Sequence, residues 1–202
     1  MKKVSVLILV LVLGACVGTS RQSKFYSLAV ENAGVITAPY KNGLSVGVKE
    51  VKVPSYVDKP QMVTQNKTAV ELSVSELNRW SEPLGTMLQR TIAEDMALVL
   101  PRAAVKGQMS VREKFDYTVS VEVNKFDGQF GGEAVLEAWW YIRNAQGNTV
   151  VRKRTELSEQ LGKTYDDLAM VQSNLIAKLS RQIALQIVEK AENRTEIFVF
   201  GD

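Results

Sequence analysis

Short segments with alternating apolar and polar residues predict several strands along this chain. Successive side chains of a strand point to opposite faces, so an apolar residue at every second position indicates a half-buried strand. The clearest case is Tyr117–Val123, in which every odd-numbered residue is apolar. The same criterion, with turn residues as boundaries, predicts further strands at 24–30, 44–53, 61–65, 69–74, 133–143 and 149–157.

The segment 44–53 departs from simple alternation. Val46 and Val48 share one face, whereas Val51 and Val53 are offset from them by an odd number of residues. Either a bulge near Lys49–Glu50 reconciles the two halves, or the strand is buried on both faces. Two hairpins are also predicted, one turning at residues 66–67 and the other at 144–148.

Two longer segments show helical periodicity. The first is expected to open at Ser81-Glu82-Pro83, with Ser81 as the capping residue, and to end before Pro101. The second is expected from Tyr165 to Lys190, with Asp166 and Asp167 at its positive end. Their apolar stripes are Leu84, Leu88, Ile92, Met96 and Val99 in the first, and Leu168, Val171, Leu175, Leu179, Ile183 and Ile187 in the second.

This order of elements predicts one α+β domain with an antiparallel or mixed sheet and both helices on one face. The apolar segment Ile197–Phe200 follows the second helix. It could form an edge strand of the same sheet, add to a neighbouring subunit's sheet, or dock on a partner. Phe198 and Phe200 are therefore candidate contact residues.

The N-terminus has the pattern of a bacterial export signal. Met1-Lys2-Lys3 is basic, Val4–Leu13 is almost wholly apolar, and Leu13-Gly14-Ala15-Cys16 follows. The apolar run is too short to span a bilayer. The pattern predicts a lipoprotein signal peptide at 1–15, a lipidated tether at 16–24 and a periplasmic domain at 25–202, with an ordinary secretory signal as the alternative.

Cys16, the only cysteine, is the expected site of lipid attachment. More than one acyl chain holds a protein firmly on a membrane. Val17 stands where an aspartate would favour the inner membrane, so the outer membrane is expected, with the domain facing the periplasm. Loss of Lys2 and Lys3 leaves 23 basic against 22 acidic residues, so the charge does not indicate a nucleic-acid partner.

The composition argues against catalysis. The chain has no histidine, and its cysteine is expected to carry lipid, which excludes histidine bases, cysteine nucleophiles and His-ligated zinc. No pattern brings together two of the five carboxylates that could act as an acid/base pair, and no cofactor is expected beyond the covalent lipid. These carboxylates are Glu71, Glu76, Glu82, Asp127 and Glu133.

The glycine-rich segment Phe126–Gly132 allows two interpretations. Its glycines could cradle a phosphate, but no lysine or helix follows as in a P-loop. The plainer interpretation is a hairpin whose backbone adopts positive φ.

Trp139-Trp140-Tyr141 is the most informative constellation inside the domain. Trp140 shares its face with apolar residues and is expected in the core, which places Trp139 and Tyr141 on the opposite face. That face would offer amphipathic anchors to a partner if it is open, and would be structural if the subunit covers it. The basic residues Arg152–Arg154 indicate an edge strand protected by charge, or a contact with anionic headgroups.

Several segments in order resemble the ABC-type transport auxiliary lipoprotein family. They are the lipobox, Phe25–Leu28, Val51–Val63, Asn78–Leu84, and Phe126-Asp127-Gly128 followed by Ala134, Leu136, Ala138 and a tryptophan. Val57 stands where leucine is expected. The similarity runs through essentially the whole chain after the signal.

The resemblance implies a lipoprotein of an MCE-type intermembrane lipid transport system that supports membrane integrity. It implies a homo-oligomeric ring anchored to the outer membrane, which receives the tip of a hollow MCE needle. Two rival functions remain from the residues alone. One is a monomeric periplasmic lipoprotein that binds lipid in its own pocket, and the other is an assembly or pilot lipoprotein of a different envelope complex.

Overall fold

The computed structural model describes residues 21–199 except 67, 69, 108, 109, 111 and 112, with side chains as far as Glu192. Among these residues, no helix is both long enough and apolar enough to cross a membrane.

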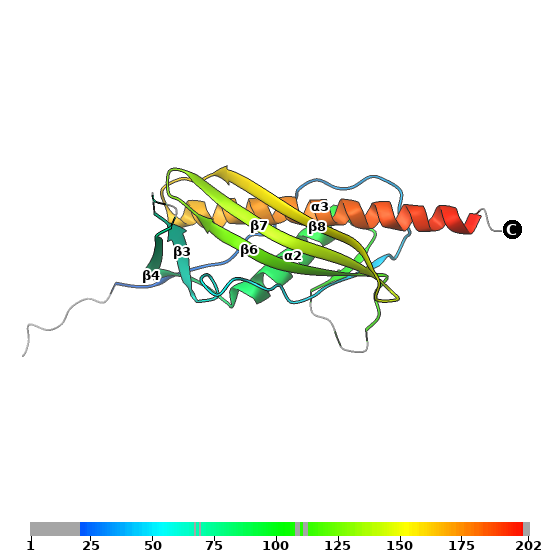
Figure 1. Ribbon diagram of the computed structural model, residues 1–202, viewed down its shortest axis with the longest axis horizontal. Helices are drawn as coiled ribbons and strands as arrows, with labels where there is room; N and C mark the ends of the chain where they lie inside the picture. Colours follow the sequence, from blue (N-terminus) through cyan, green and yellow to red (C-terminus); the bar gives the residue numbers. More distant parts are fainter. Residues whose placement is uncertain (1–20, 67, 69, 108–109, 111–112, 200–202) are drawn as a thin grey trace, which may run out of the picture.

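Within the described residues, eight strands form two separate sheets (Figure 1). The smaller sheet has the order β1-β4-β3, with β1 at Lys24–Tyr26, β3 at Gln61–Gln65 and β4 at Leu72–Trp80. The larger has the order β5-β2-β6-β7-β8, with β2 at Ser45–Val48, β5 at Ala104–Lys106, β6 at Tyr117–Gly128, β7 at Glu133–Asn144 and β8 at Thr149–Gln160. The predicted single α+β domain is confirmed, although its strands divide between two mixed sheets instead of one.

The hairpin of β3 and β4 is confirmed as antiparallel, but its second strand differs from the prediction. The strand begins at Leu72 instead of residue 69 and continues to Trp80. Its extension is stabilised by a strand far away in sequence, because β1 pairs in parallel with residues 78–80. The strand β1 itself ends at Tyr26, four residues earlier than expected.

The expected irregularity after Val48 is present. The amide of Lys49 donates to the carbonyl of Val119, and the next such bond to β6 runs from Lys52 to Val121. Between these two hydrogen bonds the segment after β2 spans three residues, whereas β6 spans two. The segment after β2 therefore contains one extra residue, as in a β-bulge. This shift allows Val48 and Val51 both to be buried despite their odd separation.

Helix α2 spans Leu84–Val99, as its periodicity predicts, but Ser81 does not cap it. The N-cap position is Pro83, and no side chain donates or accepts a capping hydrogen bond there. Because β4 extends to Trp80, the link to the helix is short. Within this link, Oε1 of Glu82 lies 2.7 Å from Nη2 of Arg90 and forms an ion pair with it.

Helix α3 spans Tyr165–Val199 and exceeds its predicted end at Lys190. Its start has the hydrogen bonds of a capping box, since the amide of Asp167 donates to Thr164 Oγ1 and Asp167 Oδ2 accepts from the Thr164 amide. Ile197–Val199 belong to the helix, which excludes the alternative of a final edge strand.

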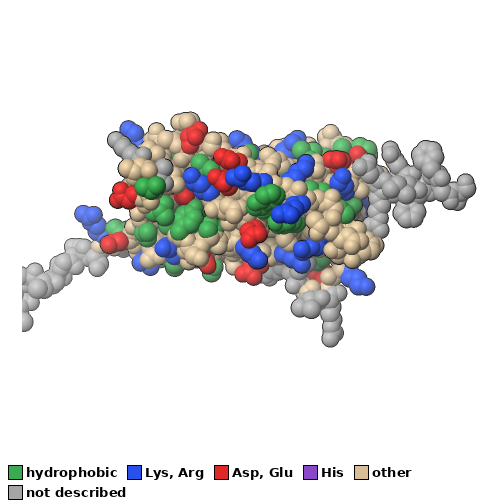
Figure 2. Space-filling view, viewed as in Figure 1, with side chains coloured by type: hydrophobic (Ala, Val, Ile, Leu, Met, Phe, Trp, Pro, Cys, Tyr) green, Lys and Arg blue, Asp and Glu red, His purple; other side chains and the backbone are tan. Residues whose placement is uncertain are grey.

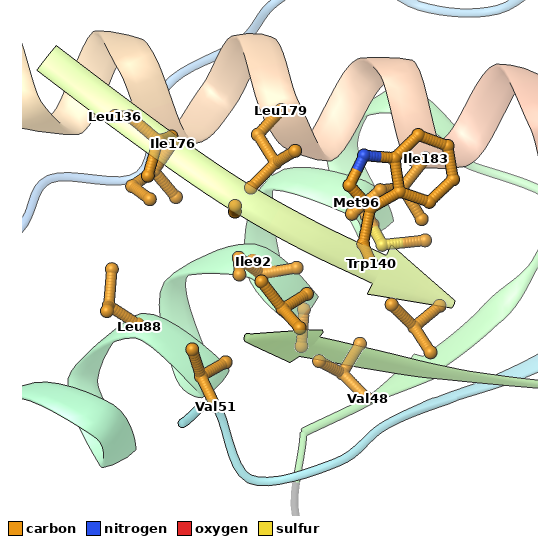
Figure 3. Packing of buried hydrophobic residues seen from close by; sticks show 14 of the residues in the cluster. Val48, Val51, Leu88, Ile92, Met96, Leu136, Trp140, Ile176, Leu179 and Ile183 are labelled. Carbon is orange, nitrogen blue, oxygen red and sulfur yellow. The ribbon is translucent and has the colours of Figure 1, made fainter. Parts of the chain in front are cut away.

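Both helices cover one face of the five-stranded sheet, as predicted. Helix α3 contacts β6, β7 and β8, while α2 contacts β2, β5 and α3, and in Figure 1 both lie behind the sheet. The core lies between these layers (Figure 3), where Ile92 and Met96 of α2 lie near Trp140 of β7 and Ile183 of α3.

Candidate interaction surface

The face of β7 that points away from the helices carries the predicted aromatic pair. Even-numbered residues from Ala134 to Ile142 are buried, whereas odd-numbered residues from Val135 to Arg143 are half-buried. Trp140 is 1% exposed and lies in the core, as predicted. Trp139 and Tyr141 lie on the opposite face, which no helix of the described chain covers.

Arg152 organises this pair from the neighbouring strand. It lies opposite Tyr141 in the β7–β8 register, and its guanidinium carbon is 5.0 Å from the centre of the Trp139 ring and 5.7 Å from that of Tyr141. These distances are typical of cation–π contacts. The guanidinium holds the rings in place while their remaining surface stays accessible to a partner.

Ion pairs extend the surface along the same two strands. The Nη2 atom of Arg154 lies 2.8 Å from Glu137 Oε2 and 3.7 Å from Glu156 Oε2. Figure 2 shows this face, on which basic side chains lie among hydrophobic ones. Large amphipathic side chains beside arginines are the usual composition of protein interface centres.

The basic residues 152–154 lie on an edge strand, as predicted. β8 is the last strand of its sheet, and Arg152, Lys153 and Arg154 are all exposed. Charged side chains on an edge discourage uncontrolled pairing with another sheet.

Trp140 is fixed by a chain of hydrogen bonds under this surface. Its indole Nε1 donates to Thr155 Oγ1 at 2.9 Å, and that hydroxyl donates to Gln182 Oε1 at 2.9 Å. The chain joins β7, β8 and α3. The backbone that presents Trp139 and Tyr141 is thereby held against the helix layer.

The glycine-rich segment is a hairpin turn, as the plainer interpretation predicts. β6 ends at Gly128 and β7 begins at Glu133, with Gly131 at a φ of 75° and the amide of Gly132 donating to the carbonyl of Gln129. Asp127, next to this turn, is only 2% exposed and accepts a 2.7 Å hydrogen bond from the Tyr56 hydroxyl. Burial raises the pKa of Asp127 and also the pKa of Tyr56.

The candidate carboxylates have separate surroundings. Glu82 pairs with Arg90, Asp127 with Tyr56, and Glu133 accepts from the Ser158 hydroxyl. Glu71 and Glu76 are exposed. The contacts that the described residues make thus assign these groups to different places and not to one acid/base pair.

Three predicted site residues are not described as side chains. Cys16 and Phe200 lie outside the described residues, together with the signal peptide and most of the tether. Phe198 lies on the helical backbone of α3, and its contacts stay a prediction.

Asp95 is a buried carboxylate that the sequence pattern did not reveal. It lies on α2 with no exposed surface, and it accepts hydrogen bonds from the Glu31 amide at 2.9 Å and the Ser180 hydroxyl at 3.3 Å. Burial raises its pKa to about 7. The helical periodicity predicts Asp95 on the polar side of α2, opposite the apolar stripe, and this prediction is wrong. The Glu31 amide and the Ser180 hydroxyl supply polar partners that allow the carboxylate to be buried.

The structure is an α+β domain whose five-stranded sheet has both helices on one face and Trp139 and Tyr141 on the other. The sequence profile of the ABC-type transport auxiliary lipoprotein component family matches residues 26–184. The chain therefore belongs to this family, whose members are described as transport auxiliaries, not as enzymes.

Curated relatives extend the match over nearly the whole chain. The chain is 26% identical over 189 residues to the intermembrane transport lipoprotein PqiC of Escherichia coli K12, covering 93% of this chain and 98% of the relative. PqiC of Shigella flexneri gives the same values. The chain is thus a PqiC-like intermembrane transport lipoprotein.

Solved structures share the fold. The crystal structure of an uncharacterised protein has a TM-score of 0.68 at 25% identity and covers 83% of this chain and 99% of its own. A protein from Xanthomonas campestris also has a TM-score of 0.68, at 13% identity, with coverage of 86% and 99%. This second likeness concerns the fold alone.

Proposed function

We propose that the protein is the outer-membrane-anchored lipoprotein of an MCE-type intermembrane transport system, where it forms a homo-oligomeric ring that receives the periplasmic MCE needle. The observation that carries the proposal is the end-to-end similarity to the intermembrane transport lipoprotein PqiC. The lipobox before Cys16 supports the anchor, and lipid on this cysteine is the one covalent group that the proposal requires.

The open face of the five-stranded sheet is the proposed contact surface. Trp139 and Tyr141 supply two large rings, and Arg152 already orders them, so little conformational entropy is lost when a partner binds. The surrounding ion pairs form a polar rim. A second subunit or the needle can bury this surface while Arg154 keeps its ion pairs with Glu137 and Glu156.

The test is the native mass of the chain from residue 16 onward carrying Cys16→Ser, measured by light scattering with and without a co-expressed MCE partner. A discrete oligomer that co-elutes with the partner is expected. A monomer that ignores the partner would overturn the ring and the docking together. In that case extraction for bound lipid would test the function of a monomeric lipid-binding lipoprotein.

The double variant Trp139→Ala/Tyr141→Ala tests the contact surface. It is expected to weaken assembly or partner binding at least tenfold, because aromatic anchors at an interface centre contribute most of the binding free energy. The dissociation constant and the oligomer mass are measured together. Leu98→Ala is the matched control, since Leu98 is an exposed apolar residue of α2 and lies outside this face.

Loss of binding with an unchanged unfolding midpoint would assign the two rings to the interface. Normal assembly and normal partner binding by the double variant would remove this face from the proposal while leaving the transport role intact.

A further inference from the structure

The three-stranded sheet and the turn before β4 carry a group of exposed apolar side chains. Leu72 and Val74 of β4 are 40% and 49% exposed, Val70 just before them is 89% exposed, and Phe25 of β1 is 68% exposed. Figure 2 shows hydrophobic side chains gathered at the end of the molecule where β3 and β4 lie. Single exposed apolar residues are ordinary, but a group of them marks a contact surface.

The proposed lipid anchor lies close to this sheet along the chain. Cys16 precedes Lys24, the first residue of β1, by eight residues. Even a fully extended segment of that length reaches only about 28 Å. Lipid on Cys16 therefore keeps the three-stranded sheet within that distance of the membrane surface.

The charges near the anchor favour the same side. Arg21 and Lys24 are both exposed and lie between the lipidated residue and Phe25. Basic residues next to a lipid anchor are attracted to headgroup phosphates, and an adjacent aromatic ring prefers the interface between headgroups and acyl chains.

The opposite end of the molecule has a different character. The turn between β7 and β8 consists of Asn144-Ala145-Gln146-Gly147-Asn148, and in Figure 1 this end lies with the C-terminal part of α3, away from β3 and β4. Helix α3 has 35 residues, a length of about 52 Å. The domain is therefore longer than the reach of the tether, so it cannot stand on its far end with the three-stranded sheet directed away from the membrane.

We propose that the three-stranded sheet rests on the lipid bilayer, with Phe25, Val70, Leu72 and Val74 inserted at the level of the headgroups and α3 directed away from the membrane. The inference rests on the lipid anchor of the proposed function and adds the surface that the membrane occupies. It fixes the orientation of the domain and leaves the far end of α3 for partners in the periplasm.

The experiment uses the full-length lipidated protein in phosphatidylethanolamine/phosphatidylglycerol vesicles. An environment-sensitive fluorophore is attached to Val70→Cys in one sample and to Gln146→Cys, in the opposite turn, as the control. Spin-labelled lipid is expected to quench the label at position 70 at least threefold more strongly than the label at position 146. Equal quenching at both positions in protein that floats with the vesicles would overturn the orientation while the anchor stands.

Flotation separates this inference from the function on which it rests. Protein that does not float with vesicles lacks the anchor, and both proposals then fail. A label at position 70 that is shielded without lipid, and is not quenched by spin-labelled lipid, would assign the sheet to a contact between subunits and would overturn the membrane contact.

A second measurement uses serine variants of the chain that carries Cys16→Ser. Val70→Ser/Leu72→Ser/Val74→Ser is expected to lower its vesicle partition coefficient at least tenfold. The control Val35→Ser/Leu98→Ser/Leu185→Ser removes the same number of exposed apolar side chains elsewhere and is expected to leave partitioning unchanged. Equal effects of the two triple variants would contradict a specific membrane surface.

Discussion

Trp140→Ala is expected to lower the free energy of unfolding by about 3–5 kcal/mol, the usual cost of truncating a buried tryptophan. The side chain is 1% exposed, and its indole begins the hydrogen-bond chain through Thr155 to Gln182. Truncation leaves a cavity between β7 and α3 and removes the donor to a nearly buried hydroxyl. Urea denaturation followed by circular dichroism measures the change.

Trp139→Ala is the matched control for this prediction, because the neighbouring tryptophan lies on the open face. Its main loss is the contact with Arg152, so a cost of about 1 kcal/mol is expected. Equal destabilisation by the two variants would contradict the assignment of the two faces. Trp140→Phe keeps most of the volume and is expected to lie between them.

Asp95→Asn is expected to stabilise the protein at pH 8 and to change its stability little at pH 4. Burial raises the pKa of Asp95 to about 7 in the folded state, against about 4 in the unfolded chain. At a pH between these two values, Asp95 is protonated in the folded state but ionised in the unfolded chain. The free energy of unfolding of the wild type therefore falls as the pH rises from about 4 to 7. Above pH 7 the full cost of a buried charge is present, at most about 4 kcal/mol.

The measurement is the urea midpoint of wild type and variant at pH 4, 6 and 8. The difference between them is expected to grow with pH, because asparagine can fill the same site without ionising. Glu94→Gln is the control on the same helix, where the carboxylate is largely exposed and pairs with Arg90. If the urea midpoints of wild type and Asp95→Asn changed in parallel with pH, ionisation of Asp95 would not be the cause of the loss of stability.

Local patterns predicted the elements whose neighbours lie close in sequence. The alternation in β7 placed Trp140 inside and Trp139 outside, and the turn at residues 144–148 gave its antiparallel pairing with β8. Pairing between distant segments was missed. The strand β5 has only three residues and exists because it pairs in parallel with β2, and the smaller sheet gains its third strand because β1 joins β4 in parallel.

The ends of the helices show the same limit. Ser81 has the residue type of a cap, but the extension of β4 to Trp80 places it outside the first turn. The charged residues after Lys190 indicated an end for α3, whereas the helix continues to Val199. Local composition therefore did not determine where this helix ends.

The candidate surface was predicted in part. Trp139 and Tyr141 followed from the parity of one strand, but the role of Arg152 depends on the exact register of β8. The β7–β8 register shifts between Ile142 and Arg143, and no pattern of residues in the sequence predicts this shift. The partners of Asp95 come from an N-terminal segment and from α3, so only the tertiary structure brings them together.

The parallel pairings of the first two strands determine the order in which the chain can fold. Val46 of β2 pairs with Val105 and Tyr117, and Tyr26 of β1 pairs with Trp80. Neither strand can therefore form its pairings until segments much later in the chain have been synthesised. Such non-local contacts form slowly, because a long loop must close first. A chain that emerges from its N-terminus cannot complete the five-stranded sheet until Gln160, the end of β8, is available. If the predicted signal at residues 1–15 directs export, we expect the first third of the chain to stay open during passage through the membrane, when early folding would block it.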